Sequence, residues 1–295
     1  MTTNINFSFT RLMAVMKRDM MENWKTNIYR LIACYSGAAM AFLFGMYGVL
    51  SDNRGETGEI QYTSFCNTFH SILSFVTFFY LIVCATRIME VMNTKNKRIS
   101  YMMLPATNGE KFISRAIYVC ITSMVIFFVG LFFAELTRLA LLPLFDAPKE
   151  FSSFCLFDIM SVSFYDTIHI NPETYGASST FIPYLFLISN GLWGHSIYIL
   201  GGTYFRKHPF VKTWGICMAA FFLILYTLIN ISDEGTLIYI LKWMENLADK
   251  SSWINEEVIF STISIIFLAL TVFNWTLSYH LFRNSQITDR KLFRR

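Results

Sequence analysis

The chain has 295 residues, of which 54% are hydrophobic and only 15% charged, and its mean hydropathy is +0.44. This composition excludes an ordinary soluble domain and predicts an integral membrane protein. The net charge of +4 does not indicate nucleic-acid binding, because the Lys and Arg residues lie between apolar runs and are not gathered on one basic domain.

Residues 1–30 predict a cytoplasmic amphipathic connecting helix. Apolar residues recur at three- and four-residue spacing, which is typical of one helical face; they are Phe9, Leu12, Met13, Met16, Met20, Trp24 and Ile28. Such a helix can lie in the membrane surface or pack on a soluble partner. Trp24 and Lys25 favour the membrane surface, because both suit an interfacial position directly before a span.

Uncharged runs of about 20 residues, the length needed to cross a bilayer, follow along the chain. There are six, at Leu31–Leu50, Asn67–Thr86, Ala116–Ala134, Phe181–Phe205, Thr213–Ile231 and Val258–Phe282. Because backbone groups in lipid must be hydrogen-bonded internally, each run is predicted to be a helix. The expected fold is therefore an all-α membrane protein with a six-span domain over residues 31–282.

The distribution of cations predicts the orientation. Most Lys and Arg residues fall in residues 1–30, the inner loop 87–115, the segment after the fourth span and the tail 283–295. By the positive-inside rule, both termini are then cytoplasmic and the outer loops are 51–66, 141–182 and 232–257. We expect the loop Leu141–Ile182 to fold over the outer mouth or to lie at the interface. Leu237, Leu241, Met244 and Ala248 predict an outer helix, which is either interfacial or partly re-entrant, or else soluble.

The inner loop contains the most informative stretch, KNKRISYMMLPATNGEKFISR over residues 95–115. Cations flank a short apolar cluster, Tyr101 to Leu104. Thr107 precedes Glu110 by three residues, which predicts a capping box and a helix that starts near Asn108.

Polar residues inside the spans are candidates for a transport pathway or for helix packing. They are Asn190, His195 and Asn274. A lone membrane histidine more often bonds a neighbouring helix than performs chemistry. No metal site is expected, because His70, His195 and His280 should lie at different depths.

Near the outer end of the third span, Glu135 and Arg138 are three residues apart and predict an interfacial ion pair.

Cys66 and Cys155 are the outer cysteines. Reduced thiols are the default expectation, with a disulfide between these two as the alternative.

The segments MLPATNGEKFISR and GHSIYILGGTYFRKHPFVKTW, with the basic tail after the sixth span, resemble permease subunits of type-2 ABC exporters, particularly a divergent bacterial group. The resemblance extends to the layout of most of the chain. The long loop Leu141–Ile182 departs from that family.

The resemblance implies a multi-pass subunit of the bacterial cytoplasmic (inner) membrane that pairs with a second copy or a related permease and binds a cytoplasmic ABC ATPase. The sequence has no G-x-x-x-x-G-K-[ST] phosphate loop, so ATP and Mg²⁺ are expected in the partner, and this chain is expected to have no cofactor and no enzymatic activity. In the family a short inner helix docks on the ATPase. The matching residues here are Tyr101, Met102, Met103 and Leu104, flanked by Lys97 and Arg98.

The substrate class stays open, although aromatic residues in the second span would suit an amphipathic or lipid-like cargo. A nontransporting sensor or immunity-type subunit of the same fold is an alternative. A membrane-embedded enzyme is another, but it would need titratable groups that converge at one depth, and no carboxylate lies in mid-span.

Overall fold

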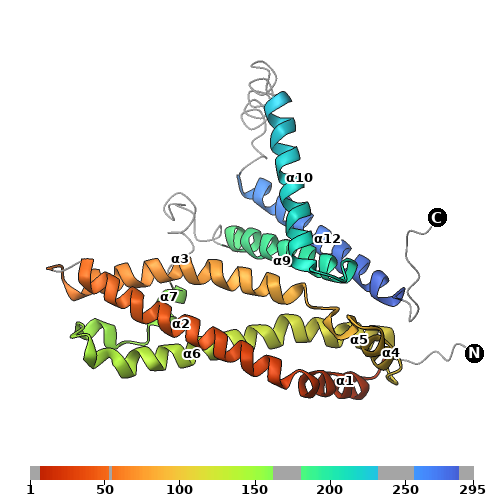
Figure 1. Ribbon diagram of the computed structural model, residues 1–295. Coiled ribbons are helices and arrows are strands. Elements are labelled where there is room, and N and C mark those ends of the chain that lie inside the picture. Colours follow the sequence, from red (N-terminus) through yellow and green to blue (C-terminus); the bar gives the residue numbers. More distant parts are fainter. Residues whose placement is uncertain (1–6, 53–54, 162–180, 232–255, 286–295) are drawn as a thin grey trace, which may run out of the picture. The chain divides into compact units, whose positions relative to one another are not determined.

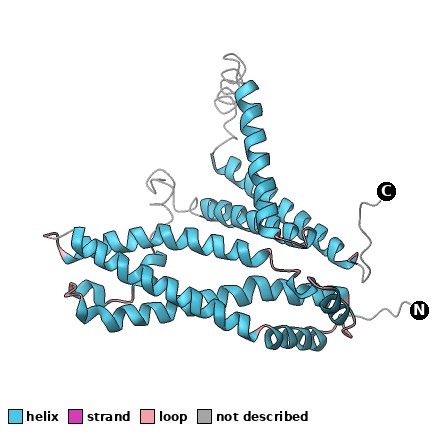
Figure 2. Ribbon diagram, viewed as in Figure 1, coloured by secondary structure: helices cyan, strands magenta, loops and turns pink. Residues whose placement is uncertain are grey.

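The computed structural model describes residues 7–52, 55–161, 181–231 and 256–285, and every regular element in these ranges is a helix (Figures 1 and 2). The chain divides into two compact units, which we describe separately. Unit 1 comprises Met1–Cys84 and Pro105–Ile170, and unit 2 comprises Ala85–Leu104 and Asn171–Arg295.

Unit 1 begins with α1 (Phe9–Glu22), whose C-cap residue is Asn23, and α2 (Trp24–Asp52) follows directly. The amphipathic helix predicted for residues 1–30 is therefore shorter, and its last residues open the first long apolar helix. After α3 (Gly58–Ala85), the unit continues with α5 (Asn108–Ile117), a π-helical turn η2 (Tyr118–Thr122) and α6 (Ser123–Leu141).

The long helices α2 and α6 pack against each other (Figure 1). Gly130 of α6 permits this approach, since a Cβ atom there would lie 2.9 Å from the Cβ atom of Cys34 and 3.2 Å from the backbone nitrogen of Tyr35 on α2. A side chain at position 130 would thus push the two helices apart.

The segment after α6 folds back into unit 1. It forms two short 3-10 turns, η3 (Leu142–Leu144) and η4 (Lys149–Ser152), and a helix α7 (Cys155–Ser161). Phe151, Cys155 and Ile159 join the hydrophobic core that Phe42, Phe65 and Phe69 form with their neighbours on α2 and α3. The described part of the predicted outer loop 141–182 is thus core structure and not only a surface cover.

Unit 2 contains a 3-10 turn η1 (Glu90–Met92), the short helix α4 (Lys95–Met102), and three long helices: α9 (Phe181–Tyr204), α10 (Pro209–Ile231) and α12 (Glu256–Arg283). The helices α9 and α12 pack closely along their lengths. Gly202 lets α9 approach the chain at Thr86, because a Cβ atom there would lie 2.6 Å from the Thr86 carbonyl oxygen.

Five helices of the described chain are long and apolar enough to cross a membrane: Trp24–Asp52, Gly58–Met92, Asn108–Leu144, Pro209–Thr227 and Phe260–Arg283. The fold is thus that of an all-α protein with several helices suited to a bilayer. Asn190, Gly191 and His195 dilute the apolar character of α9, which is not among the five although its 24 residues would suffice. The count of six spans stays a prediction.

The candidate span Asn108–Leu144 has 37 residues. At 1.5 Å per residue it is about 55 Å long, well beyond the ~30 Å of hydrocarbon. Charged residues occupy its first turns, and the uncharged stretch begins at Ala116. We therefore place residues 108–115 outside the bilayer and the membrane-spanning part of this helix from Ala116 onward.

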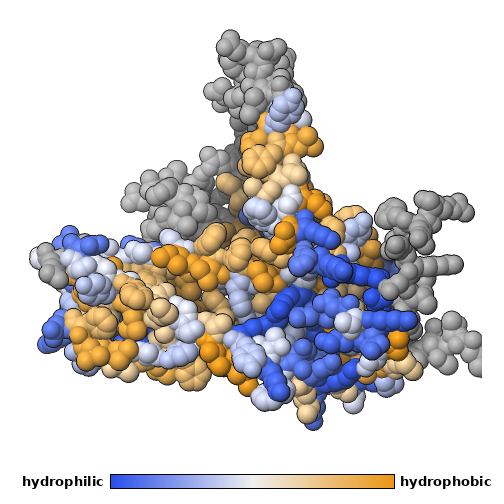
Figure 3. Space-filling view, in the orientation of Figure 1, coloured by the Kyte–Doolittle hydropathy of each residue, from blue (hydrophilic) through white to orange (hydrophobic). Residues whose placement is uncertain are grey.

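The surface of unit 1 is consistent with this placement. Apolar side chains cover the middle of α2, α3 and α6 (Figure 3). The predicted outer helix around Leu241 and the basic tail from residue 286 lie outside the described residues.

Candidate functional site

The carboxylate of Glu110 joins the beginnings of α1 and α5. Within α5 it completes a capping box, because the Thr107 backbone N–H donates to it at 2.8 Å while the Thr107 hydroxyl accepts from the Glu110 N–H. Its oxygens also accept from the Ser8 backbone N–H at 2.7 Å and from Arg11 at 2.9 and 3.2 Å. Ser8 is the N-cap residue of α1. One buried side chain therefore satisfies orphan groups of two helices.

These contacts lower the pKa of Glu110 from 4.5 to about 2, chiefly through the hydrogen bonds from Arg11 and, to a lesser degree, from the Ser8 and Thr107 backbones. The carboxylate is ionised at any physiological pH. The ion pair has a half-buried cation and a fully buried anion.

A second contact joins the far end of α1 to α5. Asp19 lies 3.7 Å from Arg115 and accepts a hydrogen bond from the Ser114 hydroxyl at 3.3 Å. All three side chains are buried. Burial raises the pKa of Asp19, and the positive charge of Arg115 opposes part of that effect. The guanidinium of Arg115 also lies over the Tyr118 ring at 4.7 Å.

The seam between α1 and α5 is narrow, because Leu12, Val15 and Asp19 are the residues of α1 that are buried. The apolar stripe predicted for residues 1–30 is mostly exposed; its exposed members are Phe9, Met13 and Met20 on α1 and Trp24 and Ile28 on α2. An exposed apolar stripe beside a buried polar seam suits a helix at a membrane surface, and it leaves the alternative of a soluble partner open.

Sequence reasoning missed the seam, although one signal was present. Leu12, Val15 and Asp19 follow three- and four-residue spacing, so they share a helical face. Nothing in the sequence shows that this face meets Glu110 and Arg115, about a hundred positions later.

The predicted docking residues lie on and just after α4. Thr94 caps this helix by accepting a hydrogen bond from the Lys97 N–H at 3.3 Å. Met103 is 75% exposed and Lys97 is also exposed, whereas Met102 and Leu104 are half-buried. Tyr101 and Arg98, three positions apart on one face, are buried. Tyr101 and Arg98 therefore do not present a surface to a partner. The exposed part of the predicted docking surface is smaller than the sequence suggested.

The three polar residues that we named for a pathway lie on two helices, Asn190 and His195 on α9 and Asn274 on α12. Asn274 of α12 is buried and donates to the Ser196 hydroxyl of α9 at 2.9 Å. His195 is half-buried and Asn190 is exposed. In this part of unit 2, Asn274 serves helix packing, which is the simpler of the two roles considered.

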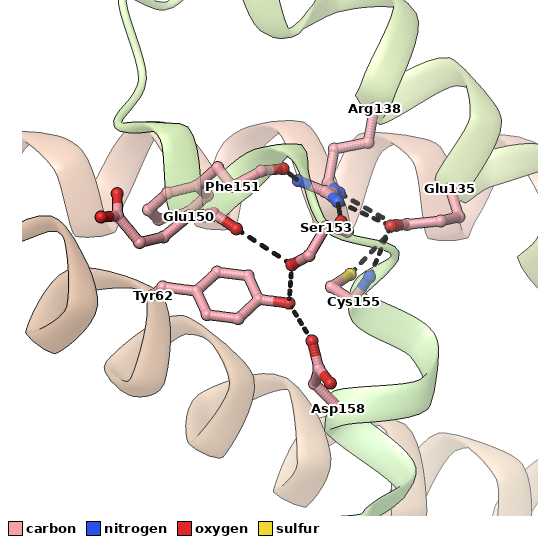
Figure 4. A network of polar contacts seen from close by, with 8 residues as sticks. All are labelled: Tyr62, Glu135, Arg138, Glu150, Phe151, Ser153, Cys155 and Asp158. Carbon is pink, nitrogen blue, oxygen red and sulfur yellow. Dashed lines mark hydrogen bonds and ion pairs between the residues drawn. The ribbon is translucent and has the colours of Figure 1, made fainter.

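Glu135 and Arg138 form an ion pair of 2.6 Å in which both side chains are fully buried (Figure 4). Arg138 also donates to the carbonyl oxygens of Phe151 and Ser153, each at 2.8 Å. Glu135 accepts from the backbone N–H of Cys155 at 2.8 Å and from its thiol at 3.0 Å. The pair thus anchors the returning segment from η4 to α7 on α6.

The network extends to α3. The Tyr62 hydroxyl donates a hydrogen bond to Asp158 of α7. The Ser153 hydroxyl in turn donates to the Tyr62 hydroxyl oxygen at 2.6 Å (Figure 4). His70 bonds the Ile159 carbonyl oxygen at 2.8 Å. These contacts are consistent with a structural role, because they join α3 and α6 to the segment from η4 to α7 within unit 1.

All six cysteines carry free thiols, including the buried Cys66 and Cys155 that were weighed as a disulfide. Among the described residues, no three His, Cys, Asp or Glu side chains lie close enough to hold a metal ion.

The fold and the site define an all-α protein with several helices long and apolar enough to cross a membrane. In it the amphipathic helix α1 is fixed to α5, which begins the candidate span Asn108–Leu144. No protein-family model, curated protein or solved structure matches the chain.

Proposed function

We propose that the chain is the permease subunit of an ATP-driven exporter of the type-2 ABC class, in the inner membrane of a bacterium. Several long apolar helices support a membrane-embedded role. The sequence resemblance of the inner loop and of the fourth and fifth spans supports the class. ATP would be bound and hydrolysed by a separate subunit, and two permease chains would enclose the path of the substrate.

The observation that carries the proposal is the junction at Glu110. It fixes α1 to α5, and α5 continues through η2 into α6. A displacement applied to this inner segment would therefore move the amphipathic helix and the third span together. Such a rigid link is what a transporter needs if the energy comes from a subunit outside the membrane.

In this proposal the ATPase contacts the end of α4. Met103 supplies an exposed, flexible apolar side chain, and Lys97 adds a positive charge on the same short helix. Methionine suits an interface that must repack during a transport cycle. The exposed apolar stripe of α1 would rest on the bilayer surface.

The test is purification of the tagged chain from its native membranes in mild detergent. We expect a copurified subunit whose peptides contain a G-x-x-x-x-G-K-[ST] motif, in a complex that hydrolyses ATP. Met103→Glu should remove that subunit and the ATPase activity, while Met103→Leu should keep both. Both variants should insert in the membrane at normal levels.

The proposal fails if no ATPase copurifies with the wild-type chain. The assignment of Met103 to the ATPase contact fails if the Met103→Glu chain copurifies with the ATPase subunit at the same ratio of ATPase to permease as the wild type. The first result would favour the nontransporting sensor, and the second would place the docking surface elsewhere.

A further inference from the structure

A cavity of about 470 Å³ lies in unit 1 between α2, α3 and α6. Its floor is formed by the buried side chains of Phe42, Phe69, Phe127 and Leu131. Its mouth is formed by exposed residues of α2 and α3; these are Ala33, Gly37, Ala41, Ile72 and Val76. The cavity is therefore an apolar groove that opens sideways, on the face that a bilayer would cover.

The register of α2 and α3 gives the groove its length. The two helices run antiparallel, and Phe42 meets Phe69 with ring centroids 5.1 Å apart. Because both helices rise equally per residue, Arg30 then lies near the level of Tyr80, and both line the cavity. Twelve residues separate Arg30 from Phe42, or about 18 Å. One leaflet of a bilayer is about 15 Å deep in hydrocarbon, half of the ~30 Å core.

The two ends of the groove differ in chemistry. At the Phe42 end the lining is apolar. At the other end stand the guanidinium of Arg30 and the hydroxyl of Tyr80. The Tyr80 hydroxyl is shielded from solvent and lies beside the thiols of Cys34 and Cys84, which are weak hydrogen-bond partners. A ligand oxygen in the groove would offer this hydroxyl a stronger acceptor than a thiol does.

We propose that this groove binds one acyl chain of an anionic phospholipid of the surrounding bilayer, with its phosphate held by Arg30 and Tyr80. The apolar groove is about as long as one leaflet and ends in a cation and a hydrogen-bond donor. That order of groups matches a lipid that enters from the bilayer with its headgroup at the membrane surface. Arg30 follows Trp24 and Lys25 by less than two turns, and these are interfacial residue types.

A second transmembrane helix fits the groove less well. Small residues at the mouth, such as Gly37 and Ala41, would allow a helix to approach. However, an apolar helix packed there would bring no oxygen acceptor to the Tyr80 hydroxyl and no anion to Arg30. The proposal does not depend on whether the chain is an exporter.

The test uses the full chain in nanodiscs of phosphatidylcholine that contain phosphatidylglycerol with a photoreactive acyl chain. After illumination, peptide mass spectrometry should find the label on α2 between Ala33 and Ala41 and on α3 between Ile72 and Val76. A photoreactive phosphatidylcholine should label these peptides roughly tenfold less, because it lacks a net negative charge for Arg30.

Gly37→Leu should fill the groove and reduce the labelling about tenfold. A Cβ atom at Gly37 meets nothing within 4 Å, so this variant is compatible with the fold. Gly48→Leu is the matched control, because Gly48 also lies on α2 in open space but does not line the cavity. It should label like the wild type.

Two further variants address the headgroup. Arg30→Gln should remove the preference for phosphatidylglycerol, whereas Arg30→Lys should keep most of it. Tyr80→Phe should weaken labelling roughly fivefold and should change the melting temperature of lipid-free protein in detergent only slightly, since the hydroxyl has only weak thiol partners within the protein. Equal labelling by both lipids, or unchanged labelling of Gly37→Leu, would overturn the proposal. So would a dimer, measured by light scattering, that Gly37→Leu dissociates while labelling persists.

Discussion

Arg11 and Glu110 are 99 positions apart in the sequence and form a two-point contact, in which the guanidinium donates to both carboxylate oxygens at 2.9 and 3.2 Å. The planar fork of arginine fits a carboxylate in this way, which fixes orientation as well as distance. Together with the Ser8 N–H, the contact holds the start of α1 against the start of α5. The amphipathic helix is thereby part of unit 1.

Replacing Glu110 with alanine should destabilise the protein by about 2 kcal/mol, because the variant loses the side-chain half of the α5 capping box and the ion pair with Arg11, and it leaves the Ser8 and Thr107 N–H groups without their acceptor. Glu110→Gln should cost less, since its amide oxygen still accepts one or two of these bonds. Thermal unfolding in detergent measures both. The control is Glu90→Gln, whose surface pair with Arg87 is half exposed and should contribute less than about 1 kcal/mol. Equal melting temperatures for Glu110→Ala and the wild type would refute the role given to this carboxylate.

The stabilising effect of Glu110 should depend on pH in one direction. Its pKa in the folded state is about 2, below the ordinary 4.5. A depressed carboxyl pKa contributes stability above the ordinary value, and that contribution disappears as the pH falls towards 2. The difference in unfolding free energy between the wild type and Glu110→Gln should be constant above about pH 5 and shrink below it. The raised pKa of Asp19 acts with the opposite sign, so only the comparison with Glu110→Gln isolates this effect.

The pair Glu135–Arg138 should be intolerant of single substitutions and tolerant of a double one. Arg138→Met leaves a buried carboxylate without its cation and should cost about 3–5 kcal/mol. The double variant Glu135→Leu/Arg138→Met removes both charges and should recover much of the loss, although the carbonyls of Phe151 and Ser153 lose their donor. A double-mutant cycle of thermal stability measures the coupling. Additive losses would mean that the two charges do not stabilise each other.

Gly202→Ala should destabilise unit 2 by about 1–3 kcal/mol, because the added Cβ atom would meet the Thr86 backbone at 2.6 Å and overpack a tight contact. Gly191→Ala is the control on the same helix, where the Cβ atom meets nothing within 4 Å, and it should stabilise slightly through helix propensity. Melting temperatures in one detergent suffice for the comparison. A harmless Gly202→Ala would show that α9 can move away from Thr86.

Local sequence signals gave the helices and the capping box. Thr107 and Glu110 predict a helix start at Asn108, and the structure has α5 begin there with both reciprocal hydrogen bonds. The long apolar runs likewise coincide with long helices, because uncharged stretches of that length have one stable conformation in lipid. Each of these signals lies within a few turns of the residues it describes.

Local sequence patterns did not predict the contacts between residues far apart in the sequence. The seam between α1 and α5 depends on Asp19 meeting Arg115, and a periodic pattern does not identify the opposite helix. Tyr101 was predicted on the docking surface because it belongs to a compact apolar cluster, yet it is fully buried. The segment after α6 was predicted as an outer loop because acids interrupt its aromatic residues. In the structure Phe151 and Cys155 belong to the core, and Arg138 holds the segment in place by donating a hydrogen bond to the Phe151 carbonyl oxygen.

The π-helical turn at Tyr118–Thr122 carries one residue more than an α-helical turn would. One residue corresponds to about 100° of rotation about a helix axis, so the turn sets the angular phase between α5 and the membrane part of the third span. Deleting a single residue there would leave both helices intact but turn the α1-binding face of α5 away from α1. The length of this short segment, more than the identity of its side chains, therefore decides which face of the span points in which direction.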